Sequence, residues 1–109
     1  MDSNIHRPNY QPEFDNAGFL RNPQQWTEQL AEEIARHDGL TELTPSHWGV
    51  IHTLREHYDR FGATPPSFHH VCHVNHLGRH GVEDLFQSQR EAWRIAGLPD
   101  PGEEARAYM

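Results

Sequence analysis

Helix start signals followed by stop signals divide this chain of 109 residues into short segments. Asn22-Pro23 and Thr44-Pro45 each place a residue type that caps helix N-termini directly before a proline, which is favoured at the first helical position. Glycines recur at the distances where such helices would end. We therefore predict a protein of short helices around one modest core.

Apolar side chains recur at three-residue and four-residue steps behind these signals, as expected for one buried face on each helix. Four helices are predicted, over about residues 23–39, 45–62, 67–78 and 82–97. The charged segments "REHYDR" and "QREAWR" read as solvated helix faces with ion pairs four residues apart. The tryptophans expected to face the core are Trp26, Trp48 and Trp93.

A turn cluster precedes the first helix. Asp15-Asn16-Ala17-Gly18 lies between Phe14 and Phe19, a pattern that predicts a small β-hairpin. The predicted class is α+β, mainly α: a small helical bundle with an N-terminal β-hairpin and a flexible C-terminal arm.

The predicted organisation has three parts. Residues 1–13, with two prolines and few apolar side chains, are expected to form a loose N-terminal arm. Residues 14–101 are expected to form one domain, and residues 102–109 a C-terminal tail with little apolar surface to hold it in place.

Charge and hydropathy exclude several classes of function. The formal net charge of -7 would repel phosphate backbones, so binding of nucleic acid is disfavoured. The 10 histidines make this charge dependent on pH, because they would add up to ten positive charges below about pH 6.5. No apolar run is long enough to span a membrane, and the first residues lack the pattern of a signal peptide, so a cytoplasmic protein is expected.

Three stretches together resemble the DsrC/TusE family of sulfur relay proteins: "FDNAGFLRNPQQW", "LTPSHWGVIHTLREHY" and "IAGLPDP". They occur in the order of the family, over about residues 14–101. The resemblance implies a mainly helical fold with an N-terminal hairpin, and protein partners in a sulfur pathway. It also implies a flexible arm whose cysteine, just after the AGLP-x-P motif, carries persulfide, and in many members a second cysteine directly before the arginine that precedes this motif.

Neither family cysteine is present in this chain. Trp93 stands at the upstream position and Glu104 at the terminal one. A sulfur carrier needs a thiolate, which neither an indole nor a carboxylate supplies. The resemblance then favours a non-thiol accessory or regulatory binding protein of sulfur metabolism, not an enzyme. By analogy with the family, the residues expected to bind the partner are Arg94, Gly97, Leu98, Pro99 and Pro101.

Cys72 is the single cysteine, which excludes an internal disulfide and a zinc site built from several cysteines. It precedes His73 directly and His76 by four residues, and an imidazolium there would favour a reactive thiolate. This leaves residual sulfur relay as an alternative function, either through Cys72 or as a noncatalytic member of a relay complex. The other interpretation of Cys72 is a small buried core residue beside Val71.

The segment "FHHVCHVNHLGRH" predicts a stripe of histidines on the third helix. Two histidines four residues apart can share a metal ion, and zinc, nickel or copper would suit them. The stripe is equally compatible with a titratable positive face. A third function is therefore a metal-responsive or DNA-binding regulator, since the second and third helices resemble a helix-turn-helix. The candidate metal ligands are His69, His73, His76 and His80.

Overall fold

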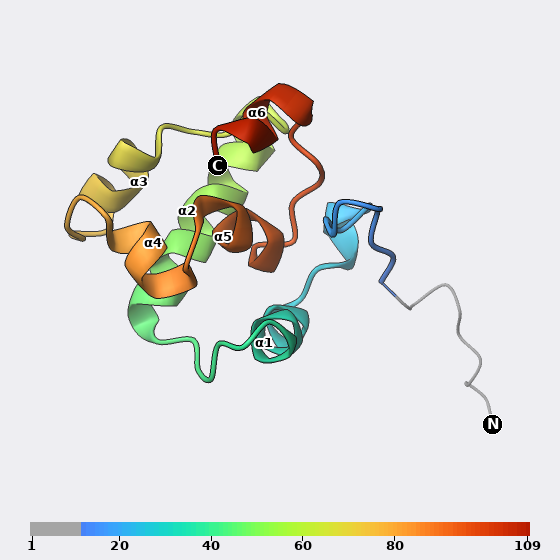
Figure 1. Ribbon diagram of the computed structural model, residues 1–109, viewed down its shortest axis with the longest axis horizontal. Helices are drawn as coiled ribbons and strands as arrows, with labels where there is room; N and C mark the ends of the chain where they lie inside the picture. Colours follow the sequence, from blue (N-terminus) through green and yellow to red (C-terminus); the bar gives the residue numbers. More distant parts are fainter. Residues whose placement is uncertain (1–11) are drawn as a thin grey trace.

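Short helices pack against one another in the computed structural model, which describes residues 12–109 (Figure 1). The predicted N-terminal arm, residues 1–13, lies almost entirely outside this range. Within it, a 3-10 turn precedes six α-helices. The elements are η2 (Pro23–Gln25), α1 (Glu28–His37), α2 (Pro45–Phe61), α3 (Phe68–Val74), α4 (Gly81–Phe86), α5 (Gln89–Ile95) and α6 (Glu103–Ala107).

Helix α2 is the longest element and contacts α3, α4 and α5, while α1 packs on α5. Its predicted bounds are confirmed. The Thr44 hydroxyl caps the helix, Pro45 occupies its first turn, and Gly62 ends it with a φ of 78°. The core lies where these helices meet, and its largest fully buried side chains include Trp93, Phe19, Phe86, Leu20, Ile51 and Leu54.

The predicted β-hairpin is wrong, because residues 12–109 contain no strand. Phe14 and Leu20 form only an isolated antiparallel bridge. The turn between them forms as expected from its sequence: the Asp15 carboxylate accepts the amides of Ala17 and Phe19, both at 2.9 Å.

Two backbone bonds make this bridge, from Asp15 N to Phe19 O and from Arg21 N to Glu13 O, both at 2.8 Å, and within residues 12–109 it does not continue into a ladder. Asn22 already caps η2, so the chain turns into a helix before a ladder can grow. The mainly helical part of the prediction is confirmed.

Two predicted helices are each divided. Thr27 starts α1 as its N-cap, which leaves Trp26 in an extended link after η2 instead of on the helix. Gln87 ends α4 with a φ of 76°, and Ser88 then caps α5. Capping residues therefore interrupt a helix even where the apolar residues continue at helical spacing.

The C-terminal tail differs from the predicted flexible arm. Residues after Gly102 form α6, and Met109 packs against the core, so the tail has more apolar surface to hold it than its sequence suggests. Asp100 supports the bend into α6: its Oδ1 accepts the Gly102 amide at 2.8 Å and lies 3.4 Å from Arg106 Nε. Across residues 12–109, no helix combines the length and apolar character that crossing a membrane requires.

Candidate functional site

The turn that follows α5 is closed by Trp93, which is fully buried. Its Nε1 donates to Pro99 O at 2.8 Å, and its own carbonyl accepts the Leu98 amide at 3.4 Å. Leu98 is itself fully buried. The indole thus fixes both the start and the end of the turn.

Gly97 is required at the centre of this turn for two reasons. Its φ of +72° lies in the left-handed region, and a Cβ there would lie 2.1 Å from Trp26 Cδ1. Trp26 is held against it by a hydrogen bond from Nε1 to Ile95 O at 2.9 Å. Any side chain at position 97 would displace this indole.

Arg55 of α2 completes the support of the turn. Its guanidinium donates to Ala96 O at 2.7 Å and to Pro23 O at 3.1 Å, and lies 4.2 Å from the centre of the Trp26 ring. Burial lowers the pKa of Arg55. The sequence-based prediction of a solvated face is wrong at this residue; its position four residues after the buried Ile51 was the available signal.

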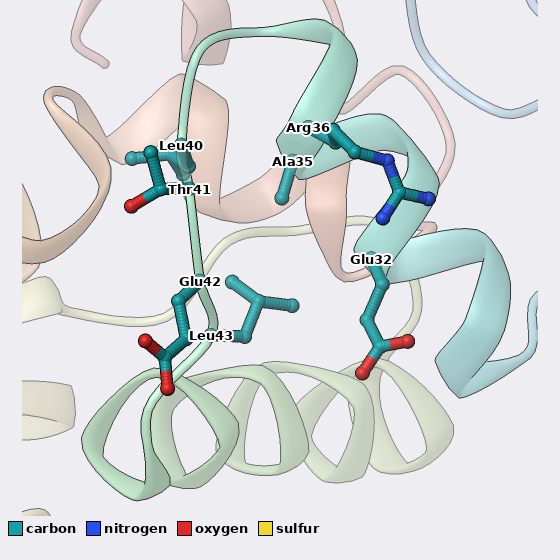
Figure 2. A pocket seen from close by; sticks show the side chains of 7 residues that line it. All are labelled: Glu32, Ala35, Arg36, Leu40, Thr41, Glu42 and Leu43. Carbon is teal, nitrogen blue, oxygen red and sulfur yellow. The ribbon is translucent and has the colours of Figure 1, made fainter.

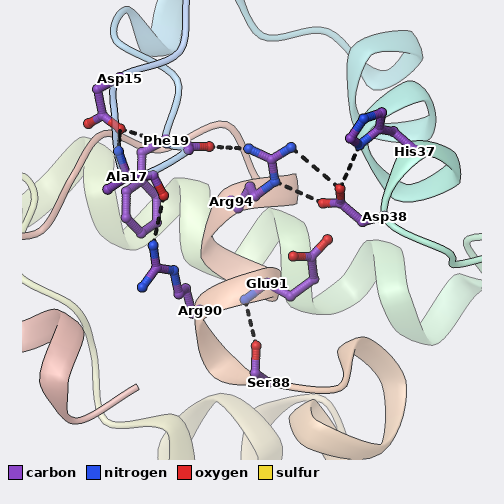
Figure 3. A network of polar contacts seen from close by, with 10 residues as sticks. Asp15, Ala17, Phe19, His37, Asp38, Ser88, Arg90, Glu91 and Arg94 are labelled. Atoms are coloured by element: carbon purple, nitrogen blue, oxygen red, sulfur yellow. Dashed lines mark hydrogen bonds and ion pairs between the residues drawn. The ribbon is translucent and has the colours of Figure 1, made fainter.

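Arg94, the next residue of α5 after Trp93, joins three segments at the other side of the turn (Figure 3). Its Nε donates to Asp38 Oδ2 at 2.8 Å and its Nη2 to Asp38 Oδ1 at 3.5 Å, while Nη1 donates to Gly18 O. His37 Nδ1 also lies 2.9 Å from Asp38 Oδ1. Residues 93–99, the base of the C-terminal arm, are thereby tied to the end of α1 and to the 15–20 turn.

Two carboxyls lie together in this network. Glu91 extends from α5 toward Asp38 (Figure 3), and among residues 12–109 its buried Oε2 has no hydrogen-bond partner. Burial, with the neighbouring Asp38 carboxylate, raises the pKa of Glu91 to about 8. Burial also raises the pKa of Asp38, but the neighbouring Glu91 carboxyl and the donors of Arg94 and His37 outweigh this effect and hold the pKa well below its usual range.

Cys72 is buried, with 4% of its surface exposed. Its thiol donates to Arg79 O at a distance of 3.9 Å from Sγ. It borders a shallow pocket that His69, His73 and Leu77 also line. The position fits the core interpretation better than an open nucleophile.

The four candidate histidine ligands do not share one helix. His69 and His73 lie on α3, but α3 ends at Val74; His76 follows with a φ of 58°, and His80 is the N-cap of α4. All four are exposed. Between residues 12 and 109, no three histidine, cysteine, aspartate or glutamate side chains are grouped to hold a metal ion.

Asn75, a residue that a helix-turn-helix would offer to bases, is engaged within the protein. Its Nδ2 donates to Thr53 Oγ1 at 3.1 Å and to Val71 O at 2.8 Å. These bonds join α3 to α2, so the amide serves packing.

A separate hollow of about 330 Å³ lies between α1 and the loop that leads to α2 (Figure 2). It contains none of the candidate residues. Its lining is mainly polar and consists of Glu32, Ala35, Arg36, Leu40, Thr41, Glu42 and Leu43.

Residues 8–103 match the protein family described as DsrC like protein. The chain belongs to the DsrC-like family. Among its relatives, the sulfurtransferase TusE of Sodalis glossinidius (strain morsitans) is 45% identical, over 80% of this chain and 87% of the relative. The sulfurtransferase TusE of Escherichia coli (strain K12) is 32% identical, over 82% of this chain and 88% of the relative. The expected membership of a sulfur relay family is confirmed.

Solved structures of DsrC-like proteins share the fold. The oxidized gamma-subunit of the dissimilatory sulfite reductase (DsrC) from Archaeoglobus fulgidus has a TM-score of 0.73 and 30% identity, covering 84% of this chain and 90% of that one. Allochromatium vinosum DsrC has a TM-score of 0.71 and 30% identity, covering 91% and 95%.

Of the candidate partner-binding residues of this DsrC-like chain, Arg94 is half-buried in the polar network, and the other four separate into two groups. Gly97 and Leu98 are buried and shape the turn, whereas Pro99 and Pro101 are half-buried at its outer side. Glu104, at the terminal cysteine position, is exposed on the first turn of α6.

Proposed function

We propose that this DsrC-like protein is a non-thiol accessory or regulatory binding protein of a sulfur pathway, which docks by its C-terminal arm without carrying sulfur there. The proposal rests on the residues at the two positions where the family resemblance implies cysteines, because neither residue is a cysteine. Trp93 is fully buried and Glu104 is an exposed carboxylate.

Neither side chain can replace the thiol chemistry. Sulfur transfer requires a thiolate that attacks the sulfane sulfur of a persulfide, so that the sulfur–sulfur bond breaks and the donor leaves as a thiolate. The indole of Trp93 is committed to packing and to Pro99 O. Glu104 offers only a negative charge, which resembles that of a thiolate to a partner with a basic site.

The support of the arm favours docking over a loss of all function. The turn is held in one conformation by the contacts of four residues: Trp93, Gly97, Arg55 and Arg94. This rigid base presents residues 99–104 at the surface. A preorganised segment loses less conformational freedom when a partner binds it.

Relay through Cys72 has less support, because a nucleophilic thiolate must be accessible to its sulfur donor. Only 4% of the Cys72 surface is exposed, and its thiol is bonded to Arg79 O.

Two experiments test the proposal. Incubated with a persulfide donor and analysed by intact mass spectrometry, the wild-type protein is expected to gain no sulfur, whereas Glu104→Cys gains one persulfide. Cys72→Ala in each background identifies the modified residue. Specific loading of wild type at Cys72, followed by transfer to an acceptor thiol, would establish the relay function instead.

The second experiment measures competition. In a relay reconstituted from a thiol-bearing DsrC-like protein and its sulfur donor, increasing amounts of the wild-type chain should lower the transfer rate. A variant that ends at residue 101 serves as the matched control and should compete less. An unchanged rate at a large excess of the wild-type chain would contradict docking.

A further inference from the structure

We propose that Glu91 and Asp38 share a single proton, and that this proton keeps the 15–20 turn, the end of α1 and α5 joined at the base of the arm. This inference concerns a proton-dependent latch inside the fold and does not depend on the proposed function.

The geometry identifies Asp38 as the anion of the pair. Its Oδ2 accepts from Arg94 Nε at 2.8 Å, and its Oδ1 lies 2.9 Å from His37 Nδ1 and 3.5 Å from Arg94 Nη2. Three cationic or polar donors therefore surround one carboxylate. Such charge-assisted contacts stabilise the ionised form.

Glu91 is in the opposite situation. Its Oε2 is buried and receives no hydrogen bond from any donor among the described residues. A buried carboxylate without donors is strongly unfavourable, and two adjacent carboxylates cannot both remain charged without a further penalty. A neutral Glu91 that donates its proton to Asp38 removes both problems.

The charged groups around the pair come from each packed element. Asp38 and His37 belong to the end of α1, and Arg94 and Arg90 to α5. The Asp15 carboxylate of the turn is occupied by backbone amides.

The charged and titratable side chains of α2 that reach the neighbouring elements have other partners. Arg55 bonds to Ala96 O and Pro23 O, and His47 Nε2 lies 2.8 Å from Leu85 O. Asp38 is therefore the acceptor left for a proton on Glu91.

Arg94 makes this pair a latch. The same guanidinium that binds Asp38 also donates to Gly18 O, and Arg90 donates to Ala17 O at 2.7 Å. A second negative charge next to Asp38 would pull Arg94 away from its position between the turn and α1. Loss of the proton would thus weaken the bonds of Arg94 to Asp38 and to Gly18 O together, and with them the links between α5, the end of α1 and the 15–20 turn.

The direction of the pH effect follows from the proton balance. Burial raises the pKa of Glu91 to about 8 in the folded protein, whereas an unfolded glutamate titrates near about 4.3. Between these values the folded state binds one more proton than the unfolded state, so stability falls as pH rises through this window and levels off above it.

The test uses the full chain. The side-chain carboxyl of Glu91, followed by carbon-detected NMR in the wild-type protein, is expected to titrate with a pKa of about 8, well above an ordinary glutamate at about 4.3. The amides of Ala17 and Gly18 are expected to shift in the same transition. Titration of Glu91 at an ordinary value would overturn the shared proton, and unmoved turn amides would overturn the latch.

Urea unfolding of Glu91→Gln provides an independent arm, because glutamine keeps a donor for Asp38 and cannot ionise. As the pH rises from about 5 to about 8.5, the urea concentration at the unfolding midpoint of the wild type is expected to decrease relative to that of Glu91→Gln. The matched control Glu103→Gln, an exposed position on α6, should follow the wild type. Parallel midpoints for wild type and Glu91→Gln would overturn the proposal.

Discussion

The base of the arm, residues 93–99, and the histidine-rich segment, residues 67–80, are both conspicuous in the sequence but differ in how the structure uses them. The base of the arm is mostly buried, and its backbone accepts bonds from Trp26, Arg55 and Trp93. The histidines are exposed and are distributed over α3 and the link between α3 and α4. The conformation of residues 93–99 is thus determined by packing, whereas the histidines of residues 67–80 lie on the protein surface.

This difference shows what a spacing argument requires. A stripe of side chains needs a continuous helix, but α3 ends at Val74 and His76 leaves the helical conformation with a φ of 58°. The turn at the arm needs no such continuity, because Trp26, Arg55 and Asp38, from distant segments, bond to Ile95, Ala96 and Arg94. Substitutions should therefore have large effects in the first region and small effects in the second.

The largest effect is expected for Trp93→Ala. Removing a fully buried indole, together with its bond to Pro99 O, should lower the free energy of unfolding by about 3–5 kcal/mol. Urea denaturation followed by circular dichroism measures it. Tyr108→Ala, at a side chain that is 79% exposed, is the control and should change stability by less than about 0.5 kcal/mol. A loss below about 1 kcal/mol for Trp93→Ala would show that the indole is not needed to hold the turn.

Gly97→Ala is expected to lower the free energy of unfolding slightly less, by about 2–4 kcal/mol. The alanine would be strained at a positive φ, and its methyl group would overlap with Trp26. Gly39→Ala is a matched control, since Gly39 also has a positive φ but nothing within 4 Å of the place where a methyl group would stand. Its loss should be about 1–2 kcal/mol. Equal losses for the two variants, measured by urea denaturation, would rule out a role for the Trp26 contact.

Arg55→Met should lower the free energy of unfolding by about 2 kcal/mol. The methionine keeps much of the packing on Trp26 but removes the donors to Ala96 O and Pro23 O. Arg60→Met on the same helix is the control, because its contact with Glu56 is an exposed pair at 3.9 Å. If the two variants lose the same stability in thermal melts, the Arg55 contacts do not support the turn.

The smallest effect is expected for His73→Ala combined with His76→Ala. Both side chains are exposed, so the free energy of unfolding should change by no more than about 0.5 kcal/mol. Calorimetric titration with Zn²⁺ tests the alternative at the same time. Submicromolar binding by the wild type that is lost in this variant would show that the segment is a metal site after all.

The sequence predicts those parts of the fold that depend on neighbouring residues. Thr44, Pro45 and Gly62 define α2 because caps and stops act within one helical turn. The same locality explains the error at the hairpin: the Asp15 turn formed, but strand pairing depends on residues beyond it, where Asn22 starts η2.

The candidate site was predicted less completely, because its contacts join distant segments. Arg94 was expected to help dock the arm or a partner only by analogy with the family, and no local pattern connects Glu91 with Asp38. His47 was also missed, although Thr44-x-x-His47 has the spacing of a capping box, and its ring nitrogen Nδ1 lies 3.0 Å from the Thr44 amide. Recognition of that spacing would have placed the His47 ring against the N-terminus of α2.

The burial of Trp93 also affects how easily this chain could regain thiol chemistry through single substitutions. At position 104 the side chain is exposed, so a cysteine could return without disturbing its neighbours. At position 93 a cysteine would leave most of the volume of an indole empty and would abandon Pro99 O. The two positions are thus unequal in evolutionary reversibility: the outer one is open to a single step, whereas the inner one requires the surrounding core to change with it.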